Sequence, residues 1–302
     1  MPTLDQHVSD SIAKLLLIGD TGEAKTGALA SLAAVGYNIR ILDLDNGVDA
    51  LVKILREKAP DCMKNVIFET LTNKMKAGIK MPVIDGNPAA WTKAMKLLTK
   101  WEVGVPGMPA ANGKPATPPS ADYYNLGPVS TWGKQDILVI DSLTFLAKAA
   151  MATVLALNGR LEAPIQIQDY GEAMRMIESL LGMLYDKSIG CHVILISHIA
   201  YLGDEGFVKG FPMTIGQKLS PQVGRYFNNC FRCTHKGSGA SIKRVIQTIS
   251  AGNVDLKNSD PYHLPAEIPF DGIEGGLATA FQILVGDPPN KWPKASTQSA
   301  TK

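Results

Sequence analysis

Residues 19–27 have the types and spacing needed to hold a polyphosphate. A loop of this kind has a glycine, four residues, a second glycine, a lysine and then serine or threonine. The chain supplies Gly19, Lys25 and Thr26 at this spacing, with Ala24 in place of the second glycine. Lys25 would reach the β and γ phosphates, and the Thr26 hydroxyl would ligate magnesium. The pattern predicts a phosphate-binding loop, or P-loop.

The backbone of the P-loop would supply further phosphate contacts. Its amides meet the N-terminus of a following helix, where aligned N–H groups and the helix dipole attract anions. We expect Ala24 to lie where the chain is already turning helical, so its β-carbon would crowd the phosphate and weaken binding without forcing unfavourable backbone angles. The expected contacts are Gly19, Asp20, Thr21, Gly22, Glu23, Ala24, Lys25, Thr26 and Gly27.

The surrounding elements are those of an α/β sheet. A buried strand at 15–18 leads into the loop, and a helix at 26–35 follows it. Apolar runs that could form further buried strands begin at residues 38, 66, 136 and 191. The alternative for the loop alone is a glycine-rich turn without a ligand. The polar residues that end these strands argue against that alternative.

Three side chains end strands of the expected sheet. Asp45 would lie at the edge where ligands bind, or would cap the helix that follows. Asp141 is the expected magnesium ligand beside Thr26, acting through a water. His198 is placed to sense the γ phosphate, with a local hydrogen-bonding role as the alternative. Asp141 at this distance from a P-loop predicts nucleotide binding strongly.

Two stretches are predicted to lie outside the core. Residues 103–134 are rich in Pro, Gly, Ala and Ser, which predicts an exposed insertion. Residues 286–302 predict a disordered tail, which leaves one domain over residues 1–285. A C-terminal antiparallel strand pair is expected on either side of residue 236. Its Cys230 and Cys233 would point to opposite faces, so they could not share a metal ion.

Composition limits the partners. The chain has 30 basic and 28 acidic residues, so its net charge of +2 exerts no overall attraction for nucleic acid or membranes. The four cysteines form no disulfide pattern, no secretory signal begins the chain, and no apolar run approaches the ~20 residues of a membrane span. A cytoplasmic protein without membrane contact is expected.

The glycine-rich stretch 201–218 is too long for an ordinary connection. Its Lys209, Lys218 and Phe211 could grip a nucleic-acid backbone and stack on bases. A flexible surface loop with two solvated lysines is the alternative. Repeated around an oligomer, such loops would form a basic track that a chain of small net charge otherwise lacks.

Together these motifs resemble the RecA-like core ATPases, most closely the short phage-encoded ATP-binding proteins, some of which are single-strand annealing recombinases. The resemblance covers residues 14–283 and rests on residues 19–26, 41–49, 132–144 and 193–198. It implies an α/β fold with a mostly parallel central sheet flanked by helices, and ATP and magnesium as ligands. It also implies a homo-oligomer with nucleotide at the subunit interfaces.

The resemblance implies roles as well. Asp45 stands where the family has the glutamate that activates the attacking water, and its shorter side chain favours slow turnover. Lys25, Asp45, Asp141 and His198 form the expected catalytic set. The family places the strand ending at His198 between the P-loop strand and the Asp141 strand. Lys257 resembles a basic residue that reaches a neighbouring subunit's nucleotide in ring helicases.

The predicted function is that of an ATPase in phage DNA recombination or single-strand annealing. It would bind single-stranded DNA as an oligomer in the host cytoplasm, with a single-strand binding protein as a further partner. The alternative is a nucleotide-gated assembly or regulatory protein with slow turnover and no DNA binding. A small-molecule kinase is disfavoured because no second basic cluster could form a lid over an acceptor.

Overall fold

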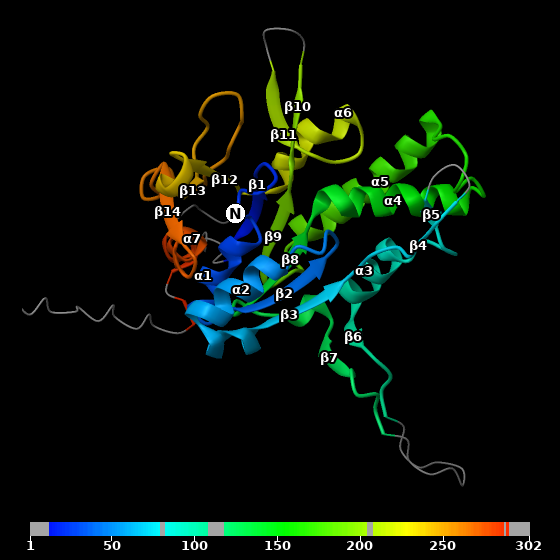
Figure 1. The fold of residues 1–302 in the computed structure, drawn as a ribbon, viewed down its shortest axis with the longest axis horizontal. Helices are drawn as coiled ribbons and strands as arrows, with labels where there is room; N and C mark the ends of the chain where they lie inside the picture. Colours follow the sequence, from blue (N-terminus) through cyan, green and yellow to red (C-terminus); the bar gives the residue numbers. More distant parts are fainter. Residues whose placement is uncertain (1–11, 79–81, 108–117, 204–207, 287, 290–302) are drawn as a thin grey trace, which may run out of the picture.

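A nine-stranded sheet forms the centre of the described part of the chain (Figure 1). The computed structural model describes residues 12–78, 82–107, 118–203, 208–286 and 288–289. Six neighbouring strands are parallel, in the spatial order β3 (Val66–Thr70), β2 (Asn38–Asp43), β8 (Asp136–Asp141), β9 (His192–Ser197), β1 (Lys14–Ile18) and β12 (Asn229–Lys236). Antiparallel strands continue the sheet as β13 (Lys243–Gln247), β14 (Glu267–Asp271) and β15 (Glu274–Gly275).

Helices cover both faces of the sheet, because its central strands are apolar throughout and must be buried on both sides. One face packs against α1 (Ala30–Ala34), α2 (Asp49–Lys58) and α7 (Gly276–Val285). The other packs against α3 (Ala90–Thr99), α4 (Leu143–Leu157) and α5 (Ile167–Tyr185). The described helices include none long and apolar enough to cross a lipid bilayer.

The order of the central strands agrees with the order that the sequence resemblance implied. β9 lies between β1, which leads into the P-loop, and β8, which ends at Asp141. This is the position that the sequence resemblance implied for the strand that precedes His198. The mostly parallel sheet and the antiparallel pair of β12 and β13 confirm the predicted fold class.

The stretch from residue 103 to 134 is only partly as expected. β6 (Trp101–Val103) pairs with β7 (Tyr124–Gly127), and Val129 and Trp132 are buried against the α3–α4–α5 layer. The expectation that the whole stretch lies outside the core is therefore wrong at its C-terminal end, where a few apolar residues suffice to anchor it. Residues 108–117, and most of the predicted tail, lie outside the described residues.

The stretch 201–218 is a hairpin and short helices, where the sequence suggested a loop. β10 (Ile199–Leu202) pairs with β11 (Lys209–Pro212), and α6 (Gly216–Leu219) follows. Figure 1 shows this hairpin projecting beyond the main sheet. Residues 204–207 at its tip lie outside the described residues.

Candidate nucleotide-binding site

The carboxyl ends of four parallel strands meet at one edge of the sheet. Asp43 of β2 pairs with Asp141 of β8, and Asp141 pairs with Ile196 of β9. On the other side of β9, Ser197 pairs with Ile18 of β1. This register brings the P-loop and the three polar strand ends together, at the edge where α/β sheets bind their ligands.

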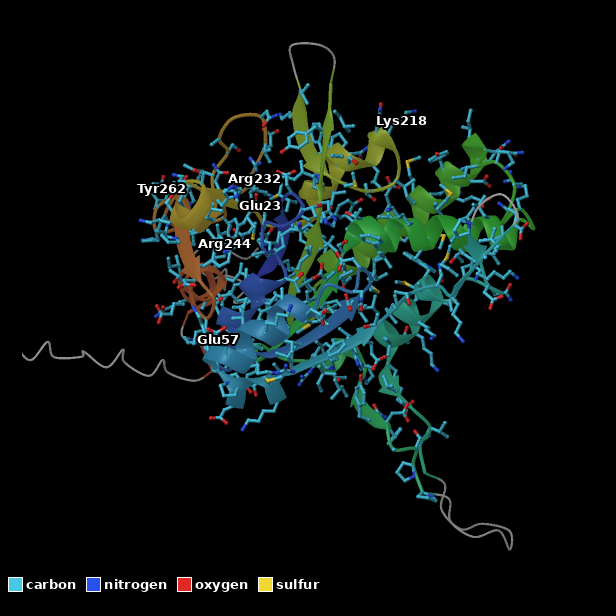
Figure 2. All side chains as sticks on the ribbon, viewed as in Figure 1. Glu23, Glu57, Lys218, Arg232, Arg244 and Tyr262 are labelled. Carbon is cyan, nitrogen blue, oxygen red and sulfur yellow. The ribbon has the colours of Figure 1, made fainter. Side chains whose placement is uncertain are left out.

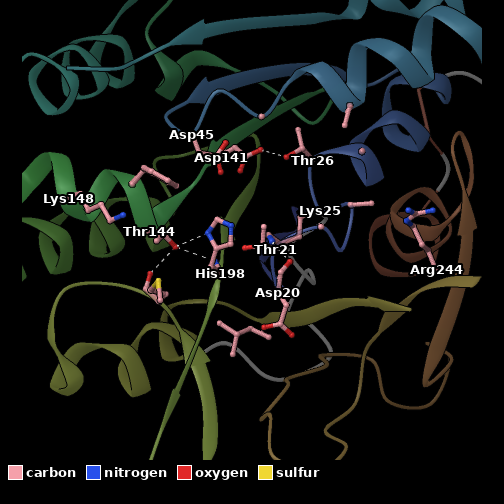
Figure 3. A pocket seen from close by; sticks show the side chains of 18 residues that line it. Asp20, Thr21, Lys25, Thr26, Asp45, Asp141, Thr144, Lys148, His198 and Arg244 are labelled. Carbon is pink, nitrogen blue, oxygen red and sulfur yellow. Dashed lines mark hydrogen bonds between the residues drawn. The ribbon is translucent and has the colours of Figure 1, made fainter. Parts of the chain in front are cut away.

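A cavity of about 740 Å³ opens at this edge (Figure 3). The P-loop contributes Asp20, Thr21, Gly22, Ala24, Lys25, Thr26 and Gly27 to its lining. Of the predicted P-loop contacts, Gly19 and Glu23 are outside the lining: the Gly19 carbonyl accepts from Lys25, and the Glu23 side chain lies against His235 on β12. Asp45, Asp141 and His198 also line the cavity, so the predicted catalytic set converges.

The P-loop is arranged to receive an anion. Lys25 is almost fully buried, and its ammonium donates to the carbonyls of Gly19 and Asp20 at 2.9 Å each. Burial lowers the pKa of Lys25, so a bound anion would favour its charged form. Within the described part of the chain, no acceptor is found for the backbone amides of Gly22, Ala24, Lys25 and Thr26. These four amides can therefore donate to a phosphate.

Ala24 has a left-handed backbone, with φ at +56°. The expectation that this residue is already turning helical is wrong, because the helix after the loop starts later, with a 3-10 turn at Gly27–Leu29. A β-carbon at positive φ is unfavourable by roughly 1–2 kcal/mol. The missing glycine therefore strains the backbone, in addition to any crowding of the phosphate.

Thr26 and Asp141, the two residues expected to hold magnesium, are in direct contact. The Thr26 hydroxyl donates to Asp141 Oδ2 at 2.5 Å. Burial raises the pKa of Asp141 to about 7, and the charge of nearby Asp45 adds to this effect. Crowded carboxylates beside a hydroxyl are hard oxygen ligands, so the residues fit a magnesium ion. A divalent cation would relieve the repulsion between these carboxylates.

Asp45 is free of the capping role that the sequence allowed. Helix α2 begins at Asp49, and its N-cap residue is Val48, without a side-chain cap. Asp45 Oδ1 is buried and has no hydrogen-bond partner in the described part of the chain. Burial raises the pKa of Asp45, which strengthens it as a base, while the charge of Lys25 opposes the shift.

His198 is held at the edge of the cavity by α4. Its backbone amide donates to the Thr144 hydroxyl at 3.2 Å, and its Nδ1 lies 3.4 Å from the same oxygen. The pKa of His198 is lowered by burial, and the charges of Lys25 and Lys148 lower it further. The ring is therefore neutral at pH 7, where it can donate or accept a hydrogen bond.

The cavity wall contains two cationic residues that the sequence did not predict there. Lys148 reaches the cavity from α4 and Arg244 from β13, on opposite sides of Lys25 (Figure 3). The sequence contains a signal for Lys148, because it is the one charged residue in the 15-residue apolar helix that follows Asp141. It contains no such signal for Arg244, whose strand reaches the P-loop only through the pairing of β13 with β12.

Comparison with known proteins finds similarity in structure alone. No protein-family model matches the chain, and no curated protein sequence matches it. A KaiC-like protein, PH0186, from the archaeon Pyrococcus horikoshii OT3 has 12% identity and a TM-score of 0.42, over 89% of this chain and 96% of that one. The flagellar accessory protein FlaH from Methanocaldococcus jannaschii has 9% identity and a TM-score of 0.39, over 90% and 89%. Residue roles at the site therefore depend on its own geometry.

The acidic side chains of the P-loop face β12 and the hairpin. Asp20 Oδ2 accepts from the Tyr201 hydroxyl at 3.1 Å and from Arg232 at 3.3 Å, and Arg232 also donates to the Tyr201 oxygen. Glu23 lies 2.8 Å from His235 Nδ1. Through its contact with Asp20, Arg232 offsets part of the negative charge that Asp20 brings to the cavity wall.

The remaining candidates do not converge on the cavity. Lys209 forms an ion pair with Asp255, and Lys218 is exposed on α6 (Figure 2). Lys257 donates to the Phe227 carbonyl of its own chain at 2.8 Å. Lys257 and Phe211 line a separate cavity of about 360 Å³ beneath the hairpin. A trans-acting Lys257 would first have to leave this intramolecular contact.

Proposed function

We propose that the chain binds Mg·ATP in the 740 Å³ cavity and hydrolyses it slowly. The carrying observation is the convergence of Lys25, Thr26, Asp45 and Asp141 on one cavity beside unpaired backbone amides. Lys25 and the amides would hold the phosphates, while Thr26 and Asp141 would hold the ion. Bound magnesium would neutralise charge on the β and γ phosphates.

Asp45 would act as the general base, because its side chain lines the cavity and burial raises its pKa. Its unpaired Oδ1 would accept the proton of a water whose oxygen bonds to the γ phosphorus. The bond to the β–γ bridging oxygen then breaks, and ADP leaves with the electron pair. The short aspartate side chain holds the water less closely than a glutamate would, so turnover is slow.

The proposed context is DNA recombination or single-strand annealing in a phage, with the chain acting as a homo-oligomer on single-stranded DNA. The sequence resemblance supports this context. A hydrogen bond from Tyr201 on the hairpin to Asp20 links the hairpin to the P-loop. Through this contact, nucleotide binding could alter the hairpin that carries Phe211 and precedes Lys218. A single-strand binding protein is a further proposed partner.

A nucleotide-gated regulatory protein without DNA binding is the second candidate. The observation that favours it is the ion pair of Lys209 with Asp255, which neutralises one of the two cations available for DNA. The strained Ala24 also fits a protein that binds ATP with little turnover.

One experiment separates the two candidates. Affinity for a fluorescent single-stranded oligonucleotide is measured against salt concentration, with and without ATP, and turnover is measured in the same samples. We expect binding that strengthens with ATP and weakens steeply with salt, because phosphate contacts release counterions. Hydrolysis without DNA binding at low salt would support the regulatory candidate.

A further inference from the structure

Lys148 is the only charged residue among the 15 of helix α4. The helix is mostly buried, with nine of its residues in the core. The Lys148 side chain is solvent-exposed, as expected for a lysine on a mostly buried helix. It also lines the 740 Å³ cavity, together with Thr144 and Phe145 from the preceding turn (Figure 3). Its ammonium could therefore contact an anion bound in the cavity.

Local contacts direct the Lys148 ammonium toward the cavity. Lys148 Nζ lies 4.5 Å from the centre of the Phe145 ring, at a cation–π distance. That ring is 6.3 Å from the His198 ring. No carboxylate within the described residues forms an ion pair with Lys148. The ammonium is thus exposed, loosely held and free to move onto a ligand.

The ends of the cavity differ in character. In Figure 3, Asp45 and Asp141 lie between Lys148 and Lys25, while Arg244 lies on the far side of Lys25. Magnesium held by Asp141 and a water held by Asp45 would both contact the terminal phosphate, so this phosphate would lie on the side of Lys25 that faces Lys148. Lys25 and Lys148 are both close to His198, because their charges add to the effect of burial in lowering its pKa.

We propose that Lys148 is a second cation for the terminal phosphate and acts within its own chain. The inference rests on the proposed function and deepens it: charge compensation during hydrolysis would come from the chain that binds the nucleotide. As the bond to the β–γ bridging oxygen breaks, negative charge grows on the leaving ADP and the γ oxygens. Lys148 supplies positive charge there and transfers no proton, so it is distinct from Asp45.

Three full-length variants test the proposal: Lys148→Ala, Lys148→Arg and the control Lys64→Ala, which removes an exposed lysine far from the cavity lining. Calorimetry gives the affinities for ADP and ATP, and steady-state kinetics give kcat and KM. For Lys148→Ala we expect kcat to fall by about 100-fold, the usual loss for one charge-stabilising group, with ADP affinity within about twofold of wild type. Lys148→Arg should recover about a tenth or more of wild-type kcat.

A mixing experiment tests action within one chain. Lys148→Ala chains keep Asp45, and Asp45→Asn chains keep Lys148, so only action between subunits would restore turnover in a mixture. We expect the mixture to stay as inactive as its components. Restored turnover, or an unchanged kcat in Lys148→Ala, overturns the proposal while leaving nucleotide binding intact. Wild-type protein that binds neither ATP nor ADP overturns the proposed function and this inference together.

Discussion

The P-loop edge of the sheet and the β10–β11 hairpin both carry candidate functional residues, and they differ in how those residues are positioned. At the edge, parallel register brings Asp141 beside Thr26, so the two side chains are 2.5 Å apart across 115 residues of sequence. On the hairpin, Lys209 pairs with Asp255, and beyond it Lys218 is exposed on α6. The first region concentrates its chemistry in one cavity, and the second disperses it.

The difference reflects the physics of the two elements. Strands buried on both faces can shift neither their register nor their ends without exposing apolar side chains, so the polar groups at their ends are fixed. A hairpin that projects from the fold has no such restraint on its outer side chains. Neighbouring charges such as Asp255 then decide which of its cations remain available.

The largest effect that we expect is the loss of nucleotide binding in Lys25→Ala. This change removes the mobile charge at the β and γ phosphates from a loop that Ala24 already strains. ATP affinity should fall by at least about 100-fold, since hydrogen-bonded charge pairs are worth several kcal/mol at desolvated sites. Calorimetry with Lys64→Ala as the control checks this result. Undiminished ATP affinity in Lys25→Ala would show that residues 19–26 do not bind the nucleotide's phosphates.

Asp45→Asn should separate chemistry from binding. Asparagine keeps the shape of the side chain but cannot take the proton of the water. We expect turnover to fall by roughly 100-fold or more, with ATP affinity nearly unchanged. Steady-state kinetics and calorimetry on the same preparation measure both quantities. An active enzyme with unaltered turnover would show that Asp45 is not the base.

The sequence could predict the strand-edge site because its signals are local. The apolar run from residue 136 to 141 predicts both a buried strand and the carboxylate at its end, and residues 19–26 predict the P-loop. Tyr201 and Asp20 are 181 residues apart in the sequence, so no local sequence pattern could predict their contact. The left-handed backbone of Ala24 could not be predicted, because the sequence does not show where the loop ends and the helix begins.

The two candidate DNA-binding lysines, Lys209 on the hairpin and Lys218 on α6, can be tested separately. Because Lys209 is already paired with Asp255, Lys218→Ala should account for most of the loss in single-strand affinity. Each lost phosphate contact should reduce the slope of log affinity against log salt by about 0.7. ATP affinity should stay unchanged in both variants. An equal effect of Lys209→Ala would show that DNA breaks the ion pair.

Ala24→Gly should give the smallest effect, and a favourable one. Glycine relieves the strain of a φ of +56°, although it also gains freedom in the unfolded chain. We expect the free energy of unfolding to rise by up to about 1 kcal/mol, with ATP affinity equal or tighter. Denaturant melts measure this change. Gly22→Ala, at φ +87°, is the matched converse and should destabilise the protein. A lower free energy of unfolding for Ala24→Gly than for wild type would show that the backbone of Ala24 is not strained.

The central claim is that the cavity is built around a chain of phosphates, and a calorimetric series of ATP, ADP and AMP with the wild-type chain in magnesium tests it most directly. Lys25 and the P-loop amides should bind ATP and ADP, one per chain, at least about 100-fold more tightly than AMP, which lacks the β and γ phosphates that Lys25 reaches. Equal affinity for the three nucleotides, or no binding of ATP, would contradict the account.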